Sequence, residues 1–334
     1  MNVNGGSKVI KYRRVINFGL KSLLLLIGVF YCSANKSFGQ NEASDHYNQL
    51  EEKYERLRDS VSRLYPLIPA VSSVMLNNKQ LEINFFNSLI TANRYRDENW
   101  DLNSIHARET YFYNTIQLTY GISKKARLNV GIDVNSVFGR IDQDENSSLF
   151  KVFNSDVEGN SKYARSVTSV SSRIRWRPLK NNYNFTVQSS VNFPTGVSTD
   201  KQSILGLSQV YFITQFLYNQ PLSKRLFFFP QLSFQYGFKN NNASSVFYVP
   251  MSVYLSYLVP KKTILFALAN YVPIFSKQNN TSYNSCTLQL GGGIQYQFSH
   301  HFLVNAYYAN NITGKNYGDF ESYNLSFRYI TIHH

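Results

Sequence analysis

Apolar and polar residues alternate along this chain from about residue 79 to its end. The alternating stretches are about 10–15 residues long and rich in aromatic residues, and a period of two is typical of β-strands with one apolar face. No stretch offers the ~20 consecutive apolar residues that a membrane-spanning helix needs. The pattern therefore predicts an all-β fold.

Connections of alternating length separate about twelve such stretches. The predicted strands cover residues 79–91, 110–121, 126–138, 164–177, 183–193, 208–219, 225–238, 245–258, 263–273, 282–298, 302–312 and 322–332. The connections within 122–125, 178–182, 220–224, 259–262 and 299–301 are short, whereas 92–109, 139–163 and 194–207 are long and polar. All the short ones follow even-numbered strands. Tight periplasmic turns and longer outer loops alternate in this way in outer-membrane barrels. We therefore expect an antiparallel transmembrane β-barrel over residues 79–334.

The first 39 residues have the layout of a secretory signal peptide. Basic residues precede an apolar run at 23–30, and Ser37 and Gly39 are the small residues expected before a cleavage site at Gln40. The alternative, a single membrane anchor, is weaker because the run has about half the length that a bilayer requires. With a barrel after it, this signal predicts export to the bacterial outer membrane, in a Gram-negative envelope.

Residues 40–78 form a predicted periplasmic segment with an amphipathic helix near 43–65. Its apolar residues recur at spacings of three and four, and Pro66 ends it. They are Tyr47, Leu50, Tyr54, Leu57, Val61 and Leu64. Two interpretations stay open: the helix packs on or partly plugs the periplasmic mouth of the barrel, or it docks another envelope protein.

Composition agrees with a barrel. Six of the 34 basic residues and none of the 20 acidic ones lie in residues 1–40, so the exported chain keeps 28 basic residues and a formal charge of +8. This charge is spread out, which argues against nucleic-acid binding. The 25 Tyr and 25 Phe residues suit aromatic girdles facing outer-membrane lipids. Once the signal is removed Cys286 is alone, which excludes an internal disulfide.

The alternation separates a lipid face from a lumen face. In the third strand Leu128, Val130, Ile132 and Val134 share one face, and Arg127 and Asp133 lie on the other. The predicted lumen residues are Arg127, Asp133, Arg173, Arg175, Arg177 and Arg328, because a charge facing lipid would cost about 2–4 kcal/mol near the bilayer centre. Such an arginine row would favour anions in a pore. Alternatively, the arginines pair with Asp133 and other acids and fill the interior.

Later strands are less polar. Tyr211, Ile213, Leu217, Val246, Leu265 and Ala267 interrupt the alternation. They predict a partly apolar interior, suited either to an amphiphilic solute or to a tight core.

The fifth strand ends in Phe193-Pro194-Thr195-Gly196, and two hairpins, at 120–128 and 221–226, pair a short turn with basic residues. In these motifs, residues 80–332 resemble the outer-membrane barrel family associated with meta-pathway phenol degradation. The members of that family are thought to be transporters, so the resemblance implies a porin-like transport barrel.

The function predicted from these features is passive passage of small, anionic or amphiphilic solutes. The alternative is a structural or assembly barrel that binds another envelope protein through its outer loops or its N-terminal helix. We expect no enzyme activity, cofactor or metal site. Of the six His residues only His106 falls in a predicted outer loop, and its neighbours match no nucleophile motif.

Overall fold

A computed structural model describes residues 75–331, except 158, 160, 181, 206–208, 241–242, 260–261 and 279–280. The predicted signal peptide and the predicted helix near 43–65 lie outside the described residues. Within the described residues, no helix is both long enough and apolar enough to cross a membrane.

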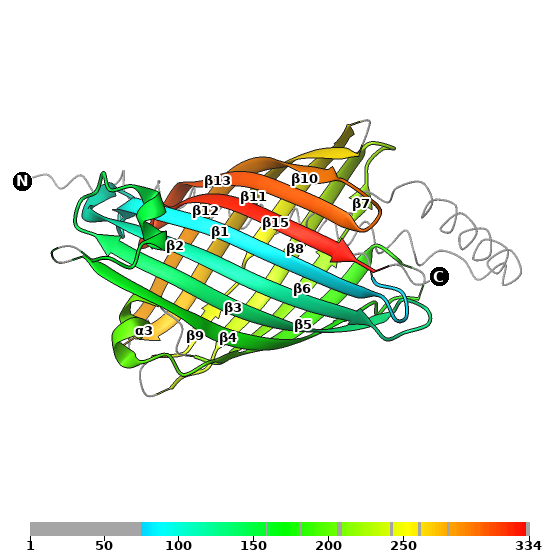
Figure 1. Cartoon of the computed structure of the whole chain (residues 1–334), viewed down its shortest axis with the longest axis horizontal. Coiled ribbons are helices and arrows are strands. Elements are labelled where there is room, and N and C mark those ends of the chain that lie inside the picture. Colours follow the sequence, from blue (N-terminus) through cyan, green and yellow to red (C-terminus); the bar gives the residue numbers. More distant parts are fainter. Residues whose placement is uncertain are drawn as a thin grey trace, which may run out of the picture. The chain divides into compact units, whose positions relative to one another are not determined.

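The described chain is a closed antiparallel β-barrel with twelve long strands, which confirms the predicted fold class (Figure 1). The long strands are β1 (Leu81–Arg96), β2 (Leu102–Gly121), β3 (Leu128–Asp142), β4 (Lys162–Trp176), β5 (Phe185–Pro194), β6 (Tyr211–Tyr218), β8 (Leu226–Gly237), β10 (Met251–Val259), β11 (Thr263–Gln278), β12 (Thr281–Gln297), β13 (Phe302–Lys315) and β15 (Glu321–Ile330). Short strands β7 (Gln220–Pro221), β9 (Val246–Tyr248) and β14 (Tyr317–Gly318) extend the sheet. Each long strand pairs with the next, and β15 pairs with β1, which closes the wall.

The expected long loop at 92–109 is wrong. β1 continues to Arg96 and β2 begins at Leu102, so only a tight turn at 97–101 joins them. The Asp97 carboxylate holds this turn by accepting the backbone N–H groups of Asn99 (2.8 Å) and Asp101 (3.0 Å). The polar composition suggested a loop, but a strand that extends beyond the lipid into water can carry polar residues on both faces.

The predicted strand at 245–258 is divided in two. β9 ends at Tyr248 and β10 begins at Met251, with Val249 and Pro250 between them. Proline has no N–H group to contribute to a strand ladder, so the pairing breaks there. The Pro250 carbonyl is still used, because it accepts the Ser233 N–H at 2.8 Å.

The two faces of the wall follow the predicted alternation in the third strand. Ile132 is 54% exposed on the lipid-facing side, while Asn129 and Asp133 on the opposite side are buried. In β11 the expectation was wrong: Leu265 is exposed on the outside, and Ile264 and its alternate neighbours point inward. Because β11 carries apolar residues on both of its faces, the sequence pattern does not distinguish its lipid-facing residues from its lumen-facing ones.

The inner face of β10–β13 carries an apolar cluster. Phe266, Leu268 and Ala309 are buried there, and Tyr254 and Tyr307 pack against them. Part of the lumen is thus filled by apolar side chains, as the less polar later strands suggested.

Two loops at the outer end fold in opposite directions. The 195–210 loop contains α3 (Thr199–Leu205), whose Ile204 and Leu205 pack on Val137 and Ala164 of the inner wall. The 143–161 loop contains the short 3-10 helix η1 (Leu149–Phe153), which contacts β2 and β3. Phe153 of η1 lies 4.9 Å, centroid to centroid, from Phe112, which shares the outward face of β2 with Ile116 and Leu118. One loop therefore narrows the mouth and the other covers the outer wall.

Candidate functional site

The lumen encloses a cavity of about 250 Å³ in the periplasmic half of the barrel. Its lining combines cations, amides, one carboxylate and a few apolar groups. The lining residues are Glu82, Asn84, Phe86, Gln117, Arg173, Arg175, Gln188, Gln215, Leu217, Gln231, Tyr254 and Arg328. They come from eight of the twelve long strands, with none from β3 or from β11–β13, so the cavity extends across much of the central passage.

Two buried ion pairs hold arginines at the edge of this cavity. Arg173 lies 3.1 Å from the Asp133 carboxylate and also donates to the Thr119 hydroxyl at 2.7 Å. Arg328 pairs with Glu82, to which its Nε donates at 2.8 Å. Each guanidinium is therefore fixed in position by a carboxylate of a neighbouring strand.

Amide side chains continue the network across the inner wall. The Nε of Arg175 donates to Gln188 at 2.8 Å, Gln188 donates to Gln215 at 2.7 Å, and Gln215 donates to Ser233 at 3.3 Å. This chain crosses from β4 through β5 and β6 to β8. Since an amide carries both a donor and an acceptor, the row can bind a solute or water at several points.

Apolar side chains also line the cavity. Tyr254, Leu217 and Phe86 contribute to the lining, and Tyr254 stands against the apolar cluster of β10–β13. The cavity is thus amphiphilic, with apolar side chains interspersed among the cations and amides of its lining.

Arg127 and Arg177 lie elsewhere. They flank β3 and β4 in the periplasmic turns, where the Arg177 N–H donates to the Arg127 carbonyl at 3.0 Å. The Arg177 guanidinium stands 4.7 Å from the centroid of the Tyr183 ring. Of the six predicted lumen residues, the structure brings Arg173, Arg175 and Arg328 to the cavity and Asp133 to Arg173.

The segment before β1 lies inside the periplasmic mouth. Met75 and Leu76 are buried, and Leu76 passes over the inner face of the Gly121–Asn129 pair of β2 and β3. The Asn129 amide, in the orientation that satisfies both groups, accepts the Leu76 N–H at 3.0 Å and donates to the Leu76 carbonyl at 3.3 Å. A Cβ on Gly121 would come 2.0 Å from the Asn77 carbonyl oxygen, so only glycine admits this path. We call Met75, Leu76 and Asn77 the inner strap.

The sequence prediction missed Glu82, the glutamines and the inner strap. Glu82 and Asn84 alternate with Leu81 and Ile83, so the same period-two signal used for the third strand could have identified them. Nothing in the sequence marks the inner strap, because its place depends on Gly121 and Asn129 far along the chain. No group of three or more His, Cys, Asp or Glu side chains suited to a metal ion occurs in the described part of the chain.

No family model and no curated protein matches this sequence. Among solved structures, the chain is similar to an outer-membrane channel from Pseudomonas putida F1, with a TM-score of 0.61 and 11% identity over 79% of this chain and 100% of that one. It is also similar to the β domain of the Bordetella autotransporter Brka, with a TM-score of 0.50 and 10% identity over 75% of this chain and 99% of that one. At such identities the likeness concerns the fold, which is that of outer-membrane β-barrels.

Proposed function

We propose that this chain is a bacterial outer-membrane channel through which small solutes pass passively, with a preference for anions. The observation that carries the proposal is the luminal cavity with Arg173, Arg175 and Arg328 in its lining. The likeness to a barrel described as an outer-membrane channel supports the class of function. The resemblance to the family associated with meta-pathway phenol degradation points the same way.

The charges of the site favour an anion. Three guanidinium groups meet two carboxylates, Glu82 and Asp133, so the cluster has a formal charge of +1. A fixed cation in a narrow, poorly screened passage raises the local concentration of anions. Because the arginines are already held by hydrogen bonds, an arriving anion meets a preformed site.

The size of the cavity restricts the solute. A cavity of about 250 Å³ is slightly smaller than the ~300–1,000 Å³ of typical small-molecule pockets. A small organic anion fits, and the apolar groups of Tyr254 and Leu217 in the lining also suit an amphiphilic one. α3 at the outer mouth and the inner strap at the other end lie in the path of anything larger.

Single-channel conductance tests the proposal. The exported chain, refolded into a planar bilayer under a salt gradient, should give discrete openings and a reversal potential that indicates anion preference. R173Q combined with R175Q should shift that potential toward cation preference, because two cations leave the site. R127Q, a change outside the cavity, is the matched control and should leave the potential unchanged.

A barrel that is folded yet silent would contradict the proposal. Folding is checked by the shift in gel mobility between heated and unheated protein. If the R173Q and R175Q double variant forms an open pore with unchanged ion preference, the arginines serve only to fill the interior.

A further inference from the structure

The 143–161 loop carries an apolar surface that the channel proposal does not use. Phe150, Phe153 and Val157 are 67%, 51% and 45% exposed. We call these three residues the loop patch. Exposing a large apolar side chain to water costs about 1.5–3 kcal/mol relative to burial, so a patch of three implies a partner.

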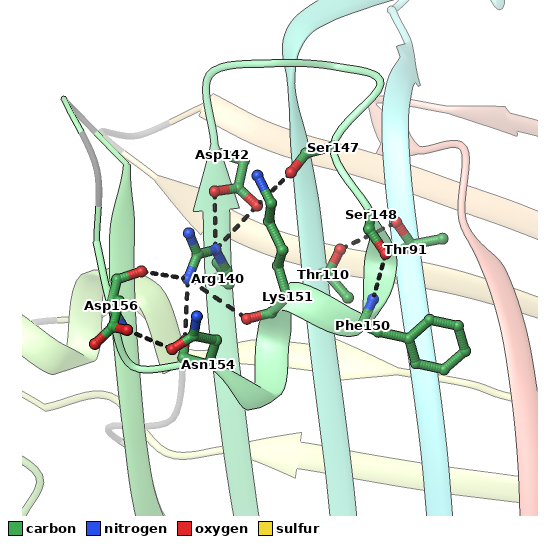
Figure 2. Close-up of polar contacts among 10 residues, drawn as sticks. All are labelled: Thr91, Thr110, Arg140, Asp142, Ser147, Ser148, Phe150, Lys151, Asn154 and Asp156. Carbon is green, nitrogen blue, oxygen red and sulfur yellow. Dashed lines mark hydrogen bonds and ion pairs between the residues drawn. The ribbon is translucent and has the colours of Figure 1, made fainter.

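This loop is firmly built against the outside of the barrel. Arg140 and Asp142 lie on the outward face of β3, in register with Val130 and Ile132, and form a buried ion pair at 2.8 Å. Arg140 also donates to the carbonyls of Asn154 (3.0 Å) and Asp156 (2.9 Å), at the end of η1 (Figure 2). These contacts form the Arg140 clamp. The clamp provides hydrogen-bond partners for the Arg140 guanidinium, which would otherwise be an unpaired charge on the outer wall.

The other contacts of the loop also involve the outer wall. Ser147 donates to Asp142 at 3.0 Å, and Val152 of η1 is fully buried. Figure 2 shows Phe150 pointing away from Arg140, Asp142 and Ser147. Phe150 therefore points away from the clamp, whereas Phe153 packs against Phe112 of the wall and stays half exposed.

The height of the loop along the barrel axis indicates which part of the membrane the loop contacts. Phe112, against which Phe153 packs, lies eight positions before Tyr120 on β2, and Tyr120 is an outward, exposed aromatic at the periplasmic end. Eight residues span about 27 Å along a strand, or about 20 Å of height at the usual tilt. The apolar band of an outer-membrane barrel is about 25 Å tall. Phe112 and the η1 helix thus stand at the outer edge of this band.

We propose that the loop patch inserts into the outer leaflet of the membrane and that the Arg140 clamp holds it there. The patch continues the lipid-facing surface through Phe112, so the same lipids that cover the wall cover the patch. The partner is the interfacial and upper acyl region of the lipid. A second copy of the chain is the competing occupant, and the test separates the two.

Quenching of tryptophan fluorescence by brominated lipid tests this placement. The chain has two Trp residues, so W100F with W176F gives a background without tryptophan, into which F150W, N146W or I132W is introduced. Each protein is refolded into phosphatidylcholine vesicles with acyl chains brominated close to the headgroup. I132W on the lipid-facing wall is the positive control, and N146W, an exposed polar position of the same loop, is the matched negative control.

The expected result is that F150W is quenched at least half as strongly as I132W, and N146W much less. Adding R140Q to F150W should reduce the quenching to the level of N146W, because the clamp is lost. Quenching of F150W no stronger than that of N146W would overturn the proposal. So would F150W emission that depends on protein concentration and not on lipid bromination, which would indicate a second copy. Full quenching in the R140Q variant would refute the role of the clamp.

Discussion

Asn129 binds both polar groups of the Leu76 backbone with its side-chain amide, at 3.0 and 3.3 Å, on the inner face of the barrel. A single side chain here replaces a neighbouring strand as hydrogen-bonding partner. The chain consequently reaches β1 from inside the mouth and not around its rim. The inner strap, residues 75–77, therefore has a defined path along the inner wall at the periplasmic end of the passage.

Replacing Asn129 should therefore loosen the inner strap. N129A removes two hydrogen bonds from a buried backbone, and each buried polar group left unsatisfied costs about 1–3 kcal/mol. We expect a lower free energy of unfolding in urea titrations of the protein in vesicles, and larger or more frequent openings in bilayers. N305A, which removes a buried inward amide of β13 that bonds Ser326, is the matched control for conductance. Openings equal to those of the wild type in N129A would show that the inner strap does not obstruct the passage.

The pair between Arg173 and Asp133 gives a second prediction. R173A leaves the Asp133 carboxylate buried without its cation, and breaking such a pair costs about 3–5 kcal/mol. The added change D133N removes the uncompensated charge and should recover most of this loss. Urea unfolding of the two single variants and of the double variant forms a double-mutant cycle. Additive losses would mean that the two side chains are not coupled.

The assignment of Ile132 to the lipid-facing side can be tested by introducing a charged side chain at this position. I132K should lower the free energy of unfolding, because the ammonium group would stand in the apolar band. The loss should be less than the ~2–4 kcal/mol of the bilayer midplane, because Ile132 pairs with Leu118, two residues from Tyr120 at the periplasmic end. Tyr113 points inward and is 37% exposed, so Y113K is the matched control and should have a smaller effect. Equal losses in the two variants would contradict the assignment of faces.

Shortening the 195–210 loop should widen the outer mouth. α3 is held inside by Ile204 and Leu205, which pack on Val137, so replacing residues 198–206 by a short Gly-Ser linker removes that obstruction. Conductance should rise while ion preference stays the same, because the arginines lie deeper in the barrel. Replacing residues 144–156, which fold outside the wall, is the comparison and should leave conductance unchanged. A reversed result would mean that the two loops were assigned to the wrong sides.

Sequence reasoning recovered those features that depend on local alternation. β3 alternates cleanly, so both of its faces were predicted, whereas β11 is apolar on both sides and Leu265 was placed wrongly. Arg173, Arg175 and Arg328 could be assigned to the lumen because each alternates with apolar residues. Asp133 could be named as a partner because it lies on the strand next to Arg173. Glu82 could not, since Glu82 and Arg328 are 246 positions apart and meet only when the barrel closes. The directions of the two outer loops depend on packing against distant strands, which no local pattern encodes.

The ion pair between Glu82 and Arg328 also bears on the order of folding. It joins the first long strand to the last, across the seam where β1 meets β15. Until β15 arrives, Glu82 has no cation from that strand and the edge of β1 is open. Neutralisation of the charge and completion of the wall thus coincide in one late step. A chain that loses its final strand would keep eleven of the twelve long strands, yet Glu82 would lack the guanidinium of Arg328 and two strand edges would be unpaired. Truncation or mutation of the last strand should therefore destabilise β1, the strand of the barrel that is farthest from it in sequence.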